Sequence, residues 1–395
     1  MTSKSSLIVF AILMFIAIVH AEVFDITKFG AKPDAEISKA LSDAWAAACS
    51  AQQPGQLVIP NGRFLLNAIE FKGPCKAPIE VKIDGTVIGP EDPITIPQGS
   101  QWITFSYVTG LTVTGSGTLD GVGGAMSWPT DDPTTTVEKG SPLQYNLNFN
   151  FLKDSSISGI TSKDSKNYHA NLLSCTNVTF DNFHAVAPKA SPNTVGIHIV
   201  WSKSITIKNS VIETGDDCIQ TGDGCENVSI EGVKCGPGRG ISVGGLGRNK
   251  NEKPVKGVFV KNCSFTSTEN GVWIKTWPHS HRGDVSDIHF EDLTMDKVDN
   301  PIIIQQDYCP HIECKKSEPS EVKIHDVFIK NVKGTSNSPE VVKLRCSSSN
   351  NGCENVQISD INLTYDGNAG PTIQECQNVK PVYAGELVPQ GCAAA

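Results

Sequence analysis

The chain has 395 residues, 39% of them hydrophobic, and a formal net charge of −9 from 33 basic and 42 acidic side chains. This length allows two average domains or one long repetitive domain. The acidic balance, with no basic tract interleaved with aromatic residues, argues against nucleic acid as a partner and gives a polyanion no long-range attraction.

The first residues predict a secretory signal peptide. Lys4 supplies a basic start, and residues 7–19 form an unbroken apolar run that ends shortly before Ala21. That run is too short to span a bilayer and lies at the N-terminus, so we expect cleavage rather than a retained signal anchor. No later segment is apolar enough to span a membrane. We therefore expect residues 1–21 to be a signal peptide and residues 22–395 to form a single secreted domain.

The cysteines and the glycosylation motifs fit an exported glycoprotein. All 13 cysteines follow the expected cleavage site, where they are candidates for disulfides, and their odd number predicts at least one cysteine outside an intramolecular bridge. No CxxC pair occurs, so a metal site built from cysteines is weakly supported. Candidate pairs are Cys218/Cys235, Cys309/Cys314 and Cys346/Cys353. Asn-X-Ser/Thr motifs begin at Asn177, Asn227, Asn262 and Asn362.

Residues 36–52 are the one segment with a helical pattern of apolar residues. Such a helix would carry its apolar side chains on one face. These side chains are Ile37, Leu41, Ala44, Trp45 and Ala48.

Short β-branched segments then recur along the rest of the chain. Each has the pattern apolar-x-apolar-polar-Asn/Asp/Gly, and the third positions fall at residues 180, 207, 230, 260, 290, 324 and 358. Periods of this length indicate stacked supersecondary units. Alternating apolar residues would point into a narrow core while the polar ones face outward. Earlier copies occupy residues 111–115 and 156–160.

This repeat predicts an all-β solenoid, specifically a parallel β-helix. Strands of three to five residues exclude helical solenoids, and no LxxLxL register of a leucine-rich repeat occurs. A propeller stays possible, although its blades need about 40 residues each. Because a solenoid must cover its hydrophobic end, we expect the 36–52 helix to cap the first coil.

The spacing of several polar residues predicts a site on one face of the solenoid. Asn193 lies 23 residues before Asp216, Arg239 lies 23 residues after it, and Lys275 follows 36 residues later. With coils of that length, these residues should stack on adjacent rungs, about 5 Å apart.

Asp216 and Asp217 are the candidate catalytic pair at the centre of this site. Glycoside hydrolysis uses two carboxyl groups, one protonated to assist the leaving oxygen and one ionised to activate water or attack carbon. Consecutive residues of an ideal strand face opposite sides, so Gly215 would have to permit a bend. The alternative is an ordinary turn in a solenoid rich in Asn and Asp.

Five segments carry a resemblance to a known family. They are residues 191–199 (SPNTVGIHI), 214–219 (TGDDCI), 235–244 (CGPGRGISVG), 271–277 (GVWIKTW) and 301–309 (PIIIQQDYC). In these segments the chain resembles the plant polygalacturonases of glycoside hydrolase family 28, especially their exo-acting, pollen-type branch. The resemblance covers nearly all of the mature chain. It implies a right-handed parallel β-helix and hydrolysis of the α-1,4-galacturonan of pectin, with inversion at the anomeric carbon. It also implies an extracellular monomer in the cell wall, with no cofactor, metal or membrane contact.

The resemblance also implies roles for individual residues. Asp216 would be the general acid, and Asp217 the general base that positions water. Lys275 would bind the substrate carboxylate, and Tyr308 would contact the sugar beside the scissile bond. Two further residues complete the expected site: Asn193 would frame it, and His169 would line the groove or else be structural.

Three positions depart from the family pattern at this site. Val195, Arg239 and Trp273 stand where the family has Asp, His and Arg. Val cannot accept a hydrogen bond from water, and Arg cannot exchange a proton near neutrality. We expect Arg239 to depress the pKa of Asp216, although its charge could replace that of the lost Arg.

These departures leave three interpretations open. The first is an active polygalacturonase with weakened turnover. The second is a catalytically impaired homologue that binds pectin or a wall partner without turnover. The third is a lyase, which would need a cluster of carboxylates for Ca²⁺, and the sequence has no evident set of that kind.

Overall fold

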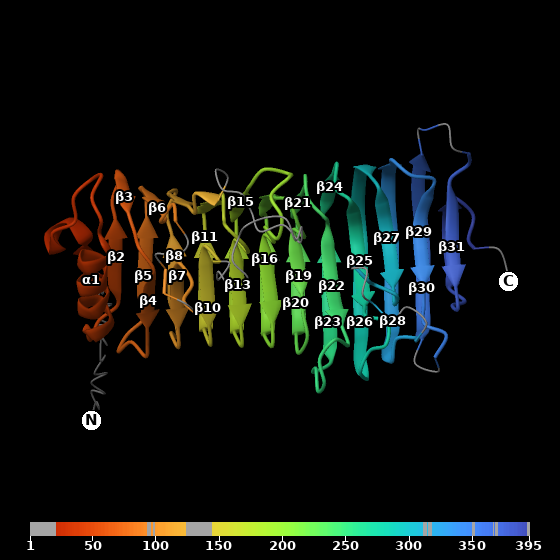
Figure 1. Cartoon of the computed structure of the whole chain (residues 1–395), viewed down its shortest axis with the longest axis horizontal. Helices are drawn as coiled ribbons and strands as arrows, with labels where there is room; N and C mark the ends of the chain where they lie inside the picture. The colour runs from red at the N-terminus through yellow and green to blue at the C-terminus, as the bar shows by residue number, and fades with distance from the viewer. Residues whose placement is uncertain are drawn as a thin grey trace, which may run out of the picture.

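The computed structural model describes residues 21–392, except residues 93–95, 98, 124–143, 311–313, 315–317, 350–351, 366 and 368–369. Its strands stack side by side along one long axis, with helix α1 at the N-terminal end and the C-terminus at the other (Figure 1). Successive strands of each face pair in parallel, which makes the molecule a right-handed parallel β-helix. The expected signal peptide lies outside the described residues, apart from Ala21.

One face of the helix is an eleven-stranded parallel sheet whose strands follow one another in sequence order. They are β4 (Ile69–Lys72), β7 (Ile103–Ser106), β10 (Leu147–Asn150), β13 (Ala170–Leu173), β16 (Ile197–Val200), β19 (Ile219–Thr221), β22 (Ile241–Leu246), β25 (Asn270–Thr276), β27 (Asn300–Gln305), β29 (Glu340–Arg345) and β31 (Ile373–Gln377).

The remaining faces form a 21-stranded sheet. Its strands are β1 (Glu22–Asp25), β2 (Gly55–Ile59), β3 (Arg63–Leu65), β5 (Ile79–Ile83), β6 (Thr86–Ile88), β8 (Leu111–Thr114), β9 (Thr118–Asp120), β11 (Lys153–Ser158), β12 (Thr161–Lys163), β14 (Thr176–Asp181), β15 (His184–Val186), β17 (Lys203–Lys208), β18 (Val211–Glu213), β20 (Glu226–Glu231), β21 (Lys234–Cys235), β23 (Val255–Lys261), β24 (Ser264–Thr266), β26 (Gly283–Val298), β28 (Val322–Ser336), β30 (Cys353–Tyr365) and β32 (Val382–Val388).

The repeated five-residue pattern explains how each coil forms. In β17 the apolar Ile205 and Ile207 are buried, while the residues between and beside them are partly or fully exposed. The Asn that ends the pattern adopts a left-handed conformation, as at Asn209 with φ 50°. Among residues other than glycine, Asn and Asp tolerate this conformation best, which is why they recur at that corner of the coil.

One predicted register of the repeat is wrong. Phe290 of β26 stacks on Ile329, whereas Ile324 stacks on Val285, five residues earlier in the ladder. Strand β28 has 15 residues with the same apolar alternation at both ends. An alternating apolar pattern is unchanged when a strand is shifted by an even number of residues, and a bend within the strand allows an odd shift. The alternation alone therefore cannot determine which residues pair.

Helix α1 (Ser38–Ser50) covers the first coil, as predicted. Trp45 lies on its buried face with its ring centroid 4.9 Å from that of Phe71 in β4. A disulfide between Cys49 and Cys75 ties the end of the helix to the loop after β4. The 3-10 helix η1 (Ile26–Phe29) packs against α1. No helix among the described residues is long and apolar enough to cross a membrane.

The predicted cysteine pairs Cys218–Cys235, Cys309–Cys314 and Cys346–Cys353 form disulfides, and Cys49–Cys75 and Cys376–Cys392 add two more. Three thiols remain free, where the odd count predicted at least one. They are Cys175, Cys225 and Cys263, all of them buried.

We predict that aromatic rings stabilise the core where they are buried, and two phenylalanines of one segment test this, since both stack on a ring of the preceding coil. Phe149 is fully buried with its ring centroid 5.6 Å from that of Phe105, whereas Phe151 is 41% exposed. Phe149→Ala should lower the free energy of unfolding by about 3–5 kcal/mol in urea denaturation. Phe151→Ala should lower it by no more than about 1 kcal/mol. Equal losses in the two variants would contradict this account of the core.

Candidate active site

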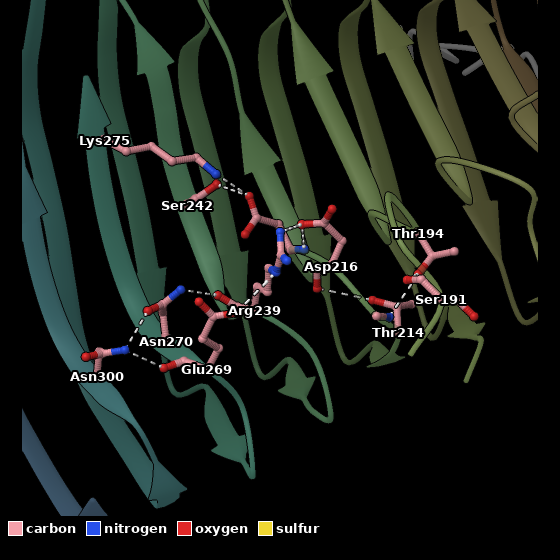
Figure 2. Close-up of polar contacts among 12 residues, drawn as sticks. Ser191, Thr194, Thr214, Asp216, Arg239, Ser242, Glu269, Asn270, Lys275 and Asn300 are labelled. Carbon is pink, nitrogen blue, oxygen red and sulfur yellow. Dashed lines mark hydrogen bonds and ion pairs between the residues drawn. The ribbon is translucent and has the colours of Figure 1, made fainter. Parts of the chain in front are cut away.

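The candidate site begins at a bend between β18 of the 21-stranded sheet and β19 of the eleven-stranded sheet. Gly215 forms this bend, as the sequence predicted. A Cβ atom there would lie 1.9 Å from the carbonyl oxygen of Ser191 on the preceding coil, so no other residue fits without movement. The Gly215 amide donates a hydrogen bond of 2.8 Å to the Thr194 hydroxyl. The bend is therefore fixed against the neighbouring coil (Figure 2).

The segments around this bend stack on adjacent rungs, as the spacing predicted. The Arg239 amide donates to the Asp216 carbonyl at 2.8 Å, and the Gly196 amide donates to the Asp217 carbonyl at 3.0 Å. Asn193 is exposed in the turn just before Thr194, with φ 58°. The disulfide from Cys218 to Cys235 links the end of the bend to the following coil.

Asp217 is held by two donors from the next two strands. Ser242 in β22 donates to its Oδ2 atom at 2.6 Å, and the Lys275 ammonium in β25 lies 2.7 Å from the same oxygen. Ser242 and Lys275 converge from neighbouring strands (Figure 2). The side chains of Asp217 and Lys275 are only 2% and 6% exposed. The other oxygen, Oδ1, is buried without a hydrogen-bond partner within the described part of the chain.

Lys275 lies in an aromatic setting that keeps water away from its charge. Its Nζ atom is 4.5 Å from the Trp273 ring centroid and 5.3 Å from that of Tyr308. Burial alone would lower the pKa of Lys275, but the Asp217 carboxylate outweighs it and raises that pKa. The lysine therefore stays protonated and forms a buried ion pair with Asp217.

Asp216 has a different environment from its neighbour. Burial and the charge of Asp217 raise its pKa, and the Arg239 guanidinium opposes them without reversing the shift. Arg239 thus lowers the pKa of Asp216, as expected, but burial and the charge of Asp217 outweigh it, so the net shift is upward. Arg239 lies 3.6 Å from Asp216 but 3.2 Å from Glu269, so it is shared between two carboxylates. Two adjacent carboxyl groups thus have different surroundings: Asp217 is bound by Ser242 and Lys275, whereas Asp216 lies beside Arg239.

The three residues expected to depart from the family pattern lie on the coils around the carboxylate pair. Val195 lies one rung from Asp217, and its side chain is buried. Trp273 pairs with Ser242 in the sheet and is 8% exposed. Its ring meets that of Tyr308 edge to face, with centroids 5.2 Å apart.

His169 does not line the groove. It is fully buried, and its Nδ1 atom lies 2.9 Å from the hydroxyl of Ser162 in β12, a strand of the other sheet. Burial lowers the pKa of His169 to about 3, so the ring is neutral. The structural alternative is the one observed. Neighbouring residues of an extended chain face opposite sides, and Tyr168 takes the outward position instead.

The sequence reasoning missed three residues on the groove side. Ser242 binds Asp217, and Tyr168 is close enough to both aspartates that their charges, added to burial, raise the pKa of its phenol. His198 stacks at an angle on Tyr168, with ring centroids 4.7 Å apart. The sheet register could have identified Ser242. His198, Ser242 and Trp273 occupy equivalent outward-facing positions on β16, β22 and β25.

No group of three or more His, Cys, Asp or Glu side chains suited to a metal ion occurs among the residues with described positions. The two carboxyl groups at the centre of the site are contacted by the cations Lys275 and Arg239 and by the Ser242 hydroxyl. Such a set can donate one proton and accept another, which is the requirement for acid–base hydrolysis.

Comparisons with known proteins point in the same direction. The family model described as "Glycosyl hydrolases family 28" matches residues 49–392. The chain is 46% identical over 372 residues to a polygalacturonase of Nicotiana tabacum, covering 94% of this chain and 92% of that protein. It is 43% identical over 371 residues to an exopolygalacturonase of Platanus acerifolia, covering 93% and 97%.

Solved structures match the fold. An endo-xylogalacturonan hydrolase from Aspergillus tubingensis superposes with a TM-score of 0.76 at 23% identity, covering 92% of this chain and 99% of that one. A hyperthermoactive exopolygalacturonase from Thermotoga maritima gives a TM-score of 0.70 at 19% identity, covering 92% of each chain. At these identities the superpositions show a shared β-helix.

We predict that Lys275 and Asp217 stabilise the fold only as a pair. Lys275→Met leaves a buried carboxylate without its cation, which should lower the free energy of unfolding by about 3–5 kcal/mol. Adding Asp217→Asn removes that charge, so the double variant should regain most of the loss in urea denaturation. A harmless single substitution, or a double variant no more stable than the single one, would disprove the coupling.

Proposed function

The chain belongs to glycosyl hydrolase family 28, and from this premise we propose that it is a glycosidase of the polygalacturonase type that hydrolyses the α-1,4-galacturonan of pectin. The single observation that carries the proposal is the contrast between its adjacent carboxyl groups. Lys275 and Ser242 bind one oxygen of Asp217 in a buried ion pair, while burial beside Asp217 raises the pKa of Asp216.

Asp216 is proposed as the general acid. A raised pKa keeps part of this carboxyl protonated above the ordinary range for aspartate, so that it can donate to the leaving glycosidic oxygen. Its side chain is 15% exposed, unlike the fully buried Asp217, so a sugar can reach it. Arg239 limits the rise in pKa but is itself drawn toward Glu269.

Asp217 is proposed as the general base. Its Oδ2 atom is occupied by Ser242 and Lys275, which leaves Oδ1 to accept a proton from water. Water activated in this way attacks the anomeric carbon on the face opposite the leaving group. Such a single displacement inverts the anomeric configuration.

The remaining site residues are proposed to position the sugar. Tyr308 and Trp273 form an aromatic corner above Lys275, where a sugar ring can pack. Asn193 lies exposed at the turn on one side of the bend and Arg239 on the other, where both can donate hydrogen bonds to hydroxyl groups.

We propose that turnover is slow. The buried Val195 side chain offers no acceptor to the attacking water, so Asp217 alone orients it. Arg239 cannot exchange a proton with Asp216 near neutral pH. A positioned acid or base contributes about 10²–10⁴-fold to a rate. The second candidate function, pectin binding without turnover, is favoured by this same clustering of substitutions at the carboxylate pair.

We further propose that the protein acts outside the cell, in the wall, as a secreted monomer. The apolar start of the sequence, the five disulfides and the four glycosylation motifs support export. Its proposed ligand is pectin, and the proposal involves no nucleic acid, membrane, cofactor or metal.

A reducing-sugar assay on polygalacturonate tests the proposed reaction. We expect slow release of reducing ends by the wild type and none by Asp216→Asn. The triple variant Val195→Asp, Arg239→His, Trp273→Arg should be at least about a hundredfold faster, because it restores a water ligand, a titratable partner and a cation.

The single reversions should show little, since residues that act as a unit couple. Activity of the triple variant should disappear when Asp216→Asn is added. A wild type as fast as the triple variant would show that Val195, Arg239 and Trp273 belong to a fully working site. A wild type without turnover that still binds polygalacturonate would favour the second candidate function.

A further inference from the structure

Three aromatic side chains form an exposed row at one edge of the eleven-stranded sheet. Tyr107, Phe151 and Trp201 directly follow β7, β10 and β16, and these strands are neighbours together with β13 (Figure 1). The three residues are 50%, 41% and 50% exposed. The candidate carboxylate pair directly precedes β19, at the opposite edge of this parallel sheet. The row is therefore separate from the candidate active site.

The backbone at this row is strained for aromatic residues. The φ values of Tyr107, Phe151 and Trp201 are 60°, 57° and 51°, in the left-handed region. Elsewhere in the described coils, Asn and Asp take most such positions among residues other than glycine, because they tolerate this conformation better than a bulky residue does. The rings are about half exposed, so burial offsets little of the strain. Strain kept without a gain in packing indicates a function for the exposed rings.

The row has a gap at Ser174, which lies between Phe151 and Trp201 in the sheet register and has the same conformation, with φ 55°. Phe151 stacks on Tyr107 with ring planes 1° from parallel, so its other face points toward the coil of Ser174. Lys253, from a later coil, lies over the far face of Trp201 at 5.8 Å from the ring centroid. The near face of Trp201 therefore also points toward Ser174.

The gap matches the thickness of one six-membered ring. Phe151 and Trp201 lie two strand spacings apart, about 9.5 Å. A ring at the level of Ser174 would lie about 4.8 Å from each of them, which is the centroid separation between Tyr107 and Phe151. The half-buried Ser174 forms a polar floor, and Asp223 fixes the Trp201 ring by accepting a hydrogen bond of 2.7 Å from its Nε1 atom.

We propose that this slot, formed by Phe151, Ser174 and Trp201, binds one unit of a neutral β-1,4-linked glycan such as a β-1,4-glucan. Every substituent of a β-1,4-glucan ring is equatorial, so both faces present C–H groups that pack on the two aromatic walls. The hydroxyl groups lie at the edge of the ring, where they meet Ser174 and water. An α-1,4-linked galacturonate unit has an axial oxygen on each face, at C1 and at C4, and would press both against the rings.

The charges near the slot suit an uncharged ligand because they balance. Three are basic and three are acidic, and each follows Phe151 or Trp201 in the chain, contacts Trp201, or pairs with one that does: Lys153, Lys203, Lys253, Asp154, Asp223 and Glu226. A neutral sugar gains or loses little from such a surface. The site would thus hold the protein to a wall polymer other than its proposed substrate.

Titration calorimetry with a β-1,4-glucan hexamer and an α-1,4-galacturonan hexamer tests the proposal. The wild type should bind the glucan hexamer, and Phe151→Ala and Trp201→Ala should each weaken that binding at least about tenfold. Phe259→Ala is the matched control, because Phe259 is also exposed, at 38%, but lies in β23 of the other sheet. It should leave the affinity unchanged. No binding of the glucan hexamer, or an equal loss in the control, would overturn the proposal.

Two substitutions of Ser174 test the slot itself. Ser174→Phe fills the gap with a ring of the chain and should abolish glucan binding, although it adds exposed apolar surface. Ser174→Gly tolerates the left-handed backbone and keeps the gap open, so binding should persist within about threefold. Equal or tighter binding by Ser174→Phe would show that a continuous apolar surface, and no slot, holds the sugar.

Two further measurements separate this proposal from other uses of the row. Sedimentation equilibrium should show the same mass for the wild type and Phe151→Ala. A wild-type dimer that Phe151→Ala abolishes would overturn the proposal, since a second copy would then cover the row. Galacturonan binding, and any release of reducing sugar, should be unchanged in Phe151→Ala because the catalytic pair lies at the other edge. Tighter binding of the galacturonan hexamer that Phe151→Ala removes would show that the row takes the acidic polymer instead.

Discussion

The buried ion pair between Lys275 and Asp217 is the interaction on which the site depends. Removing two charges from water is costly, and a buried pair often stabilises a fold no better than apolar residues of the same size. Here the Ser242 hydroxyl and two aromatic rings partly replace the lost hydration. A carboxylate bound to a buried cation, next to a carboxyl group with a raised pKa, is an arrangement suited to acid–base chemistry.

The solenoid makes this pair possible with residues that are 58 positions apart in the chain. Each coil returns to the same face one strand spacing further on, so β19, β22 and β25 present their outward side chains in one row. The bend at Gly215 then brings two consecutive aspartates to that row, which an ideal strand would not do. The coil register and one glycine thus position the site.

Much of this could be predicted from the sequence because it is local or periodic. The apolar alternation predicted the β-helix, helical spacing predicted the cap, and short separations predicted three disulfides. What failed depends on contacts between coils. An alternating pattern could not distinguish Ile324 from Ile329 as the partner of Phe290. The position of His169 in a segment that lines the groove in the family could not show that its side chain points inward. Likewise, the net pKa of Asp216 depends on burial, which spacing does not reveal.

The central claim is that the charge of Lys275 is satisfied by Asp217 within the protein. It is tested most directly by the salt dependence of trigalacturonate binding, measured by calorimetry from about 0.02 to about 0.5 M NaCl, where the screening length falls severalfold. The account predicts the same fall of affinity with salt for the wild type and for the double variant Lys275→Met, Asp217→Asn, because Lys275 is paired with Asp217 while the exposed cations Arg239 and Arg248 are present in both. A clearly weaker salt dependence in the double variant would contradict the account, since it would show that Lys275 is available to the substrate carboxylate.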